Sequence, residues 1–393
     1  MVGRVWWAVA LAGVCGCADA STTAPASASA PAPVYRPLST VAWSAQARAL
    51  VASTALGSPP AARLYAIMTV AQRVTLERIG ADTVRISPPA AIGYASARVL
   101  LALLPSQSVL VQTTLLNELR QPGVGTPASL AAAKTLGELV ADSLLRVRAS
   151  DSTALLDNVV LPTGPGVWES APGKVPVNPR WGEARPWLLP SAAAITVPPP
   201  PAITSAAFQT ALAEVRRISD TRTEEQLAIA RFWVLGSGTP TPPGWWNGVA
   251  TDLCVHYRLT ERQCATTLAT LHQAMMDASI VTWVAKYRFL LARPFQMDPA
   301  ITQPVGLSNH PSYPSAHSTY SSAAGTVLAW YFPREKPLLD RWVSEANVSR
   351  IYGGVHYRFD GDQSDVIGRQ VGALFVTSFA ANGLRPYLAV TPR

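Results

Sequence analysis

The chain has 393 residues and a mass of 41.8 kDa, enough to bury one large core or two to three smaller ones. Apolar residues make up 49% of it and charged residues 14%, against about 25% in an average globular protein, which excludes a disordered or collagen-like chain. The net charge is +8, but the basic residues form no run of five, so we expect no nucleic-acid partner. Histidine is scarce, at five residues.

The N-terminus has the pattern of a leader followed by a linker. Residues 1–17 contain a basic residue, ten consecutive apolar residues and then small residues, which predicts an export signal too short to span a bilayer. Two outcomes stay open: Cys17 is lipidated, as in bacterial lipoproteins, or cleavage occurs near Ala20. Residues 18–37, rich in Ala, Pro and Ser, predict a linker. We expect a periplasmic, outer-membrane or secreted protein that meets a membrane only through a lipid anchor.

From residue 38 onward the hydrophobic period is helical, and strand signals are few. Segments 162–201 and 236–246 are rich in proline and predict irregular connections. The sequence therefore predicts an all-α protein, with two packed helical bundles in a single domain, residues 38–393, and long Pro-rich connections. Helices are expected at 63–79, 90–104, 110–119, 131–147, 205–218, 223–234 and 261–291.

Two cysteines follow the leader and linker, Cys254 and Cys264, and both flank helical pattern. An exported protein can oxidise such a pair to a disulfide, or the two can stay as buried thiols. The sequence leaves both outcomes open.

A first candidate site segment runs from Trp283 to Pro294. Lys286 and Arg293 are seven residues apart, which predicts one shared helical face, with Trp283 one turn earlier and Pro294 ending the helix. Two cations facing one way beside an indole suit an anion. The alternative is an ordinary solvated cationic face.

A second segment is Pro314-Ser315-Ala316-His317, followed by a helical run. Ser315 is expected to cap that helix, whose first backbone N–H groups then form an oxyanion site. His317, in the first turn, can exchange protons with a bound group. Alone, the segment would favour a surface histidine at a helix start.

A third segment contains Arg350, His356 and Asp360. His356 and Asp360 are spaced i,i+4, so the carboxylate can accept the imidazole N–H and leave the other ring nitrogen as a ligand or nucleophile. A structural His–Asp pair is the alternative. His256 and His272 lie outside all three segments and are interpreted as structural.

The three segments in this order, Lys-x6-Arg-Pro, Pro-Ser-x-His and Ser-Arg-x5-His-x3-Asp, fall within residues 286–360. This arrangement resembles the signature shared by vanadium-dependent haloperoxidases and the type 2 phosphatidic acid phosphatase superfamily, which includes bacterial acid phosphatases. Every charged and histidine position matches, while Ala316 stands where glycine is usual. The sequence Pro242–Asn247 and Asp277 also look like the bacterial haloperoxidase branch. The resemblance is strong over residues 223–360 and places the site within residues 245–370.

The resemblance implies roles for these residues. His356, oriented by Asp360, would be the axial vanadium ligand of a haloperoxidase or the phosphohistidine-forming nucleophile of a phosphatase, and His317 would be the acid–base group. A halide or substrate pocket would be bordered by Trp283 and His310, with His310 favouring bromide over chloride. The oxygens of vanadate or phosphate would be bound by Lys286, Arg293, Arg350, Ser315 and the N–H of Ala316.

The same resemblance implies a catalytic domain with vanadate as cofactor, oxidising bromide or iodide with hydrogen peroxide to hypohalous acid and acting on small organic acceptors. An exported acid phosphatase without this cofactor is the alternative, and an oxyanion-binding protein with an inactive site is a third. The sequence leaves open whether two chains associate as a homodimer.

Overall fold

The computed structural model describes residues 38–155, 159–306 and 309–387. The expected export signal, residues 1–17, and the expected linker, residues 18–37, lie outside this part of the chain. The described residues form thirteen α-helices and no strand, which confirms the all-α class. Within these ranges, no helix combines the length and apolar character needed to cross a membrane.

The first five helices build one bundle around a core that includes Trp43, Leu64 and Ile92. Their starts follow from local chemistry, because prolines occupy the first positions of α2, α3 and α5, where the missing N–H is not needed. Ser87 and Thr126 cap α3 and α5 with their side-chain oxygens. The bundle comprises α1 (Ser39–Ser53), α2 (Ser58–Ile79), α3 (Pro88–Leu103), α4 (Ser108–Leu119) and α5 (Pro127–Val147).

A second core gathers side chains from α8, α9, α11, α12 and α13. In it, α11 and α13 approach closely at Gly368, which has no Cβ. A Cβ at this position would lie only 2.7 Å from the backbone nitrogen of Ala323. This close approach sets the start of α11 against the start of α13, where the candidate residues lie. The helices are α8 (Thr241–His256), α9 (Glu261–Phe289), α11 (Ala316–Tyr331), α12 (Lys336–Tyr352) and α13 (Arg358–Ala381).

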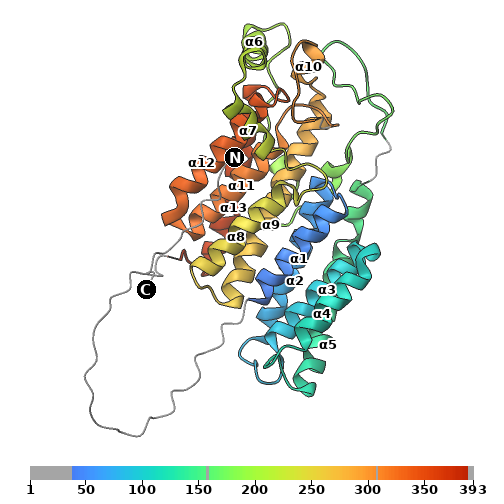
Figure 1. Ribbon diagram of the computed structural model, residues 1–393, viewed down its shortest axis with the longest axis vertical. Coiled ribbons are helices and arrows are strands. Elements are labelled where there is room, and N and C mark those ends of the chain that lie inside the picture. Colours follow the sequence, from blue (N-terminus) through green and yellow to red (C-terminus); the bar gives the residue numbers. More distant parts are fainter. Residues whose placement is uncertain (1–37, 156–158, 307–308, 388–393) are drawn as a thin grey trace, which may run out of the picture. The chain divides into compact units, whose positions relative to one another are not determined.

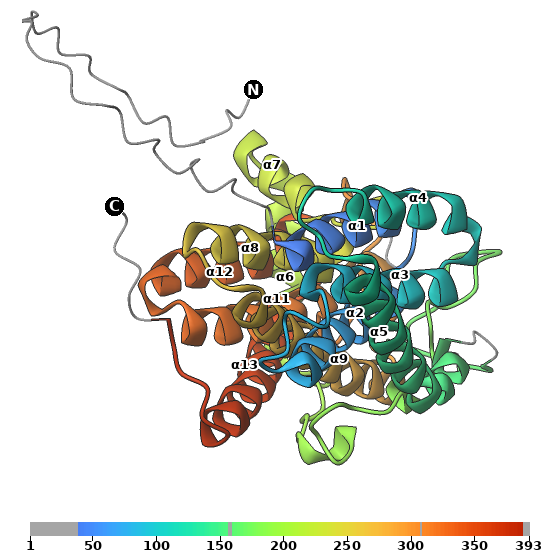
Figure 2. The ribbon, with the colours of Figure 1, turned by 90° about the horizontal axis from the view of Figure 1, so that it is seen from below.

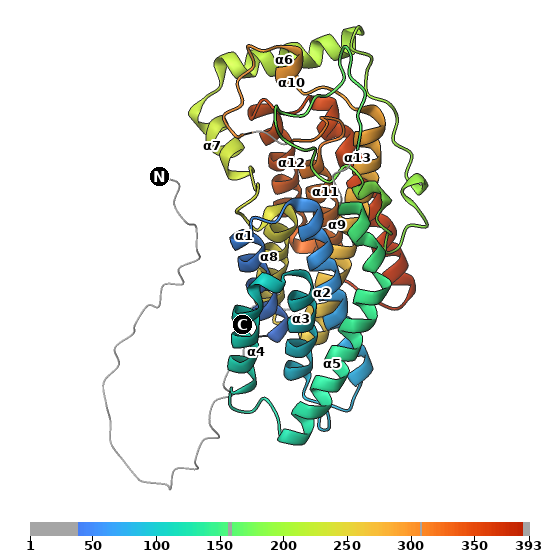
Figure 3. The same ribbon diagram turned by 90° about the vertical axis from the view of Figure 1, so that its right-hand side faces the viewer.

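Helix α9 joins the two bundles. It packs against α2 of the first and against α11 and α13 of the second, and most of its residues are buried (Figures 1 and 2). The two packed bundles predicted from the sequence are therefore present, with α9 between them. The shorter helices α6 (Ala206–Thr221), α7 (Glu224–Phe232) and α10 (Pro294–Met297) lie near one end of the second bundle, where α6 and α7 pack against α12 (Figure 3).

The Pro-rich segment 162–201 contains only two 3-10 helices and lies against α9. The buried indole of Trp181 donates to Ser279 Oγ (2.9 Å), and Asp277 accepts the backbone N–H groups of Trp187 (2.6 Å) and Leu188 (2.9 Å). Asp277, singled out from the sequence, thus anchors this segment to α9.

The prediction that Lys286 and Arg293 share one helical face is wrong. Helix α9 ends at Phe289, and Leu290 takes a left-handed conformation with φ 49°. Arg293 is extended, with φ −73° and ψ 156°, because the residue before a proline avoids the helical region. Its side chain reaches the site from a separate segment.

Two further sequence expectations change in the structure. The prediction of a loop through Trp246 is wrong at its end, because α8 already begins at Thr241 and places Pro242 and Pro243 in its first turn, where proline is tolerated. Cys254 and Cys264 are buried free thiols, which decides between the two outcomes left open.

Candidate active site

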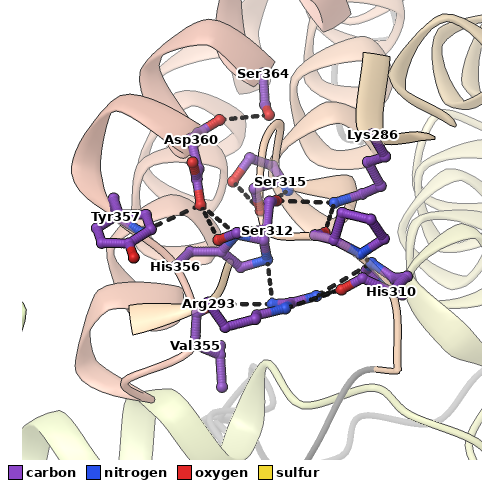
Figure 4. A network of polar contacts seen from close by, with 12 residues as sticks. Lys286, Arg293, His310, Ser312, Ser315, Val355, His356, Tyr357, Asp360 and Ser364 are labelled. Atoms are coloured by element: carbon purple, nitrogen blue, oxygen red, sulfur yellow. Dashed lines mark hydrogen bonds and ion pairs between the residues drawn. The ribbon is translucent and has the colours of Figure 1, made fainter. Parts of the chain in front are cut away.

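Three segments, distant in sequence, meet at the end of the second bundle where α11 and α13 begin. They are the C-terminal part of α9 with the extended residues after it, the loop that leads into α11, and the turn between α12 and α13. Figure 4 shows their side chains pointing toward one another. The structure therefore gathers the charged and histidine residues of all three sequence motifs.

Arg293 links the three segments. Its guanidinium donates to the carbonyl oxygen of His310 (3.0 and 2.9 Å) and to that of Val355 (2.7 Å). It also contacts His310 Nδ1 (3.1 Å) and His356 Nε2 (3.0 Å). Because a guanidinium has no acceptor, the contact with His356 requires a lone pair on its Nε2, whereas His310 Nδ1 also lies 3.2 Å from the carbonyl oxygen of Pro311. The Nε2 atom of His356 is thus a free base facing a cation.

The other ring nitrogen of His356 faces Asp360. Its Nδ1 donates to Asp360 Oδ2 at 2.8 Å, and the same oxygen accepts from Ser312 Oγ (2.5 Å) and from the backbone N–H of Tyr357 (3.2 Å). Burial raises the pKa of Asp360 to about 6, while the Ser312 hydroxyl and the charge of Lys286 lower it. Burial, then the charges of Arg293 and Lys286, hold the pKa of His356 well below its usual range, so the ring is neutral.

Lys286 is buried on the other side of the loop. Its Nζ donates to the carbonyl oxygens of Pro311 (2.7 Å) and Ser312 (2.9 Å). Burial and the nearby charge of Arg293 lower its pKa well below the usual range, and Asp360 acts in the opposite direction. An anion placed beside Lys286 would favour its charged form.

The start of α11 provides the second motif as expected. Ser315 caps the helix, and its Oγ accepts from the Ser318 hydroxyl (3.0 Å) and lies 3.5 Å from the Ser318 nitrogen. The first turn-closing bond runs from Thr319 to the carbonyl oxygen of Ser315, so the N–H groups of Ala316 and His317 precede the helical ladder. Ala316 adopts helical dihedral angles at the first helical position, which a residue with a Cβ accommodates without strain.

Arg350 contacts the backbone of α7, and His317 contacts the backbone of the segment directly after it. Arg350 donates to Ser349 Oγ (3.0 Å) and to the carbonyl oxygen of Ala230 (3.2 Å). His317 Nε2 lies 2.8 Å from the carbonyl oxygen of Val234, so Nε2 carries the proton and Nδ1 carries a lone pair. Burial, followed by the charge of Arg350, lowers the pKa of His317 to about 3.

A cavity of about 270 Å³ opens beside these groups. Arg350 and His317 line it together with Trp283 and His310, whose rings are 5.3 Å apart and tilted by 45°. Apolar side chains such as Val234 complete the wall. The sequence-predicted pocket residues therefore do border a cavity, next to the oxyanion-binding candidates.

The positive charge of the site is only partly compensated. Lys286, Arg293 and Arg350 are all buried, and Asp360 is the carboxylate that acts on the first two. Burial lowers the pKa of Arg293 to about 10 and that of Arg350 to about 9. Buried cations without counter-charge are unfavourable, so the arrangement favours a bound anion.

Comparisons with known proteins agree with this geometry. The family model of the PAP2 superfamily matches residues 267–383, the stretch that holds all three motifs. Among curated proteins, none matches the chain in sequence.

Solved structures extend the comparison to most of the chain. A bacterial vanadium-dependent iodoperoxidase is similar with a TM-score of 0.77 at 24% identity, covering 87% of this chain and 96% of that one. A bacterial vanadium-dependent chloroperoxidase is similar in its apo-type and holo-type structures, with TM-scores of 0.67 and 0.63 at 14% identity. Both cover 82% of this chain, and 95% and 93% of theirs.

The chain has the fold of the vanadium-dependent haloperoxidases. The resemblance read from the three motifs is confirmed for the superfamily pattern and for the fold. Of the upstream residues that look like the haloperoxidase branch, Asn247 contacts the Nε2 of His272 (2.8 Å). His272 is buried and its ring stacks on Tyr65, which fits the structural role expected of it, whereas His256 is exposed.

Within this haloperoxidase fold, several contributors to the site escaped the sequence reading. Ser312 contacts Asp360, and the backbone oxygens of Ala230 and Val234 hold Arg350 and His317. A carbonyl oxygen has no sequence signature. Ser312 had only a weak signature, because its position shortly before the Pro-Ser turn does not by itself distinguish a site residue from a loop serine.

Proposed function

We propose that this protein is an exported vanadate-dependent haloperoxidase that oxidises bromide or iodide with hydrogen peroxide to hypohalous acid. The observation that carries the proposal is His317, a half-buried neutral base at the edge of the cavity, next to a cluster of cations. The similar fold of bacterial iodo- and chloroperoxidases supports it.

The residues present fit vanadate. This oxyanion needs positive charge around its oxygens and one nitrogen donor, and the site offers three buried cations and the Nε2 lone pair of His356. Ser315 and the N–H of Ala316 lie at the start of α11, where an anion is favoured. Bound vanadate would supply a Lewis acid that activates peroxide.

The state of His317 without a bound anion supports oxidation over phosphate hydrolysis. A peroxidase needs a base that removes a proton from hydrogen peroxide, and the Nδ1 lone pair of His317 provides one. A phosphatase needs the same group protonated so that it can donate to a leaving alcohol. Burial and the charge of Arg350 oppose that protonation, because they lower the pKa of His317 to about 3.

The pair of Trp283 and His310 supports a halide pocket. Where His310 Nδ1 accepts from Arg293 (3.1 Å) rather than donating to the carbonyl oxygen of Pro311 (3.2 Å), its Nε2 carries the proton. An N–H donor beside an indole suits a large, polarisable anion such as bromide or iodide. Small organic acceptors would react in or near the cavity that these rings border.

A phosphatase is the second candidate, favoured by the superfamily match over residues 267–383. The same His356 Nε2 would attack phosphorus and form a phosphohistidine, with Asp360 orienting the ring. Vanadate would then be an inhibitor rather than a cofactor.

The two functions separate in one assay series. Purified protein reconstituted with orthovanadate is expected to brominate or iodinate a dye with hydrogen peroxide, and to release little phosphate from p-nitrophenyl phosphate. Phosphate release without any peroxide-dependent halogenation between pH 4 and 9 would sink the haloperoxidase proposal.

Two histidine variants test the assigned roles. His356→Ala is expected to lose vanadate by more than about 100-fold in affinity, because even outer-shell changes cost 10- to 100-fold. His317→Ala is expected to keep vanadate and lose turnover, by at least about 100-fold. Equilibrium dialysis with vanadium analysis measures the first, and steady-state kinetics the second. The exposed His256→Ala is the matched control for both.

A further inference from the structure

Ser312 lies in the loop that leads into α11, and its polar groups connect this loop to the other two site segments. It is fully buried. Its N–H donates to the carbonyl oxygen of Leu291 (2.9 Å), which lies in the extended segment before Arg293. Its carbonyl oxygen accepts from Lys286 (2.9 Å), and its hydroxyl donates to Asp360 Oδ2 (2.5 Å), as Figure 4 shows.

The Ser312 hydroxyl contacts only one of the two carboxylate oxygens of Asp360. Asp360 Oδ2 accepts from His356 Nδ1, Ser312 and the backbone N–H of Tyr357, whereas the buried Oδ1 has no hydrogen-bond partner among the described residues. Ser312 Oγ also lies 3.5 Å from His356 Nδ1. The carboxylate takes both protons, since it is the acceptor that the serine and the imidazole share.

We propose that Ser312 is a positioning residue that acts through Asp360 to fix the tautomer and the orientation of His356. With Oδ2 held in place, the imidazole proton stays on Nδ1 and the lone pair stays on Nε2, the atom that faces Arg293 at 3.0 Å. Without the hydroxyl, only the Tyr357 N–H and the imidazole hold Oδ2, so the carboxylate can rotate and in part of the molecules the proton can move to Nε2, against the opposition of Arg293, where it would block the nitrogen that would ligate vanadium. The consequence for vanadate rests on the proposed function, whereas the tautomer does not.

Three variants isolate the hydroxyl. Ser312→Ala removes it, and Ser312→Cys keeps a side chain of similar shape with a weaker donor. The matched control is Ser322→Ala, because Ser322 is buried like Ser312 and also donates to a carboxylate of α13, Asp365 Oδ1 (2.6 Å), away from His356.

The first measurement is the nitrogen NMR of the histidine rings in the full protein without added oxyanion. Wild type and Ser322→Ala are expected to show His356 with its proton on Nδ1. Ser312→Ala is expected to show a mixture of tautomers, and Ser312→Cys a smaller fraction of the second form. An unchanged tautomer in both Ser312 variants overturns the proposal, and so does the same mixture in Ser322→Ala. If Ser312→Ala does not fold, Ser312→Cys decides.

The second measurement is the dissociation constant of orthovanadate from dialysis. Ser312→Ala is expected to bind about 10- to 100-fold more weakly than wild type, the usual cost of losing an outer-shell partner, with Ser312→Cys between them. Full affinity in both variants would overturn the consequence for vanadate. If wild type binds no vanadate, the proposed function fails, and the tautomer comparison still decides the role of Ser312.

Discussion

Two buried clusters of cations in this protein differ in how their charge is balanced. In the first, here called the structural arginine cluster, Arg63 and Arg148 share Asp151, at 3.6 and 2.7 Å. Arg148 also lies over the Trp187 ring (4.3 Å), and Asp277 acts on it from α9. Two cations thus face two carboxylates, and the cluster is complete without a ligand.

The second cluster, here called the site cluster, holds Lys286, Arg293 and Arg350 with Asp360 alone among the carboxylates that act on them. Burial lowers the pKa of every cation in both clusters, so desolvation does not distinguish them. The two clusters differ in their balance of charge. A neutral cluster stabilises the fold by itself, whereas a cluster with excess positive charge is stabilised when an anion binds.

Removing one cation from each cluster is expected to have the largest and most different effects on stability. Arg148→Met leaves the buried Asp151 with only the longer pair to Arg63, which is expected to lower the free energy of unfolding by about 3–5 kcal/mol. Arg350→Met removes an unbalanced cation, so the protein without added anion should be unchanged or more stable by about 1–4 kcal/mol. Urea unfolding followed by circular dichroism measures both.

The same two substitutions should affect phosphate affinity in the reverse order, with Arg350→Met having the larger effect. Arg350→Met is expected to bind phosphate about 10- to 100-fold more weakly, the cost of a charged hydrogen bond, and Arg148→Met, where it folds, to bind normally. Equal destabilisation by the two substitutions in the absence of anion would contradict the distinction between the clusters.

The site cluster was predictable from sequence and the structural arginine cluster was not. Lys286, Arg293, His317 and His356 fall in a motif whose spacing is dictated by the chemistry of one oxyanion, so the residues reveal it directly. Arg148 also contacts Arg185, Pro186 and Met276, which lie 37, 38 and 128 residues further along the chain, and no local pattern joins them.

The path of the backbone from α9 to Arg293 also could not be predicted from the sequence. The helical period across residues 261–291 predicted α9 well, but not that Leu290 would turn left-handed and deliver Arg293 on an extended segment. That path depends on tertiary pairing, because Leu291 bridges to Val167 in the Pro-rich segment. Periodicity reports local preference, and here a contact across more than a hundred residues outweighs it.

Two histidines, His272 and His317, also differ in whether they face the site cluster. Burial lowers the pKa of both His272 and His317 to about 3, but His317 also faces the site cluster, while His272 faces Arg48. Saturating phosphate is expected to raise the pKa of His317 by at least one unit, because the anion offsets Arg350, and to leave that of His272 unchanged. Ring-nitrogen NMR over a pH titration measures both.

The same pKa values give the sign of the acid response. Both rings are neutral in the folded protein and gain a proton on unfolding below pH 6.5, so their stabilising contribution is present above 6.5 and is lost as pH falls toward 3. Phosphate should reduce this loss for His317. Parallel rises for both histidines would indicate a general effect of salt and remove the support for an anion site.

The smallest expected effect concerns Ala316, where the superfamily pattern usually has glycine. If the charges of the site cluster provide most of the binding energy for an oxyanion, the methyl group of Ala316 should have little influence on anion affinity. Ala316 already has helical dihedral angles, so Ala316→Gly opens no forbidden conformation and is expected to change phosphate affinity by less than about threefold. It should lower the free energy of unfolding by about 0.5–1 kcal/mol, the usual cost of glycine in a helix. A tenfold tighter phosphate complex in calorimetry would instead show that the Ala316 methyl group crowds the oxyanion, and that shape as well as charge limits this site.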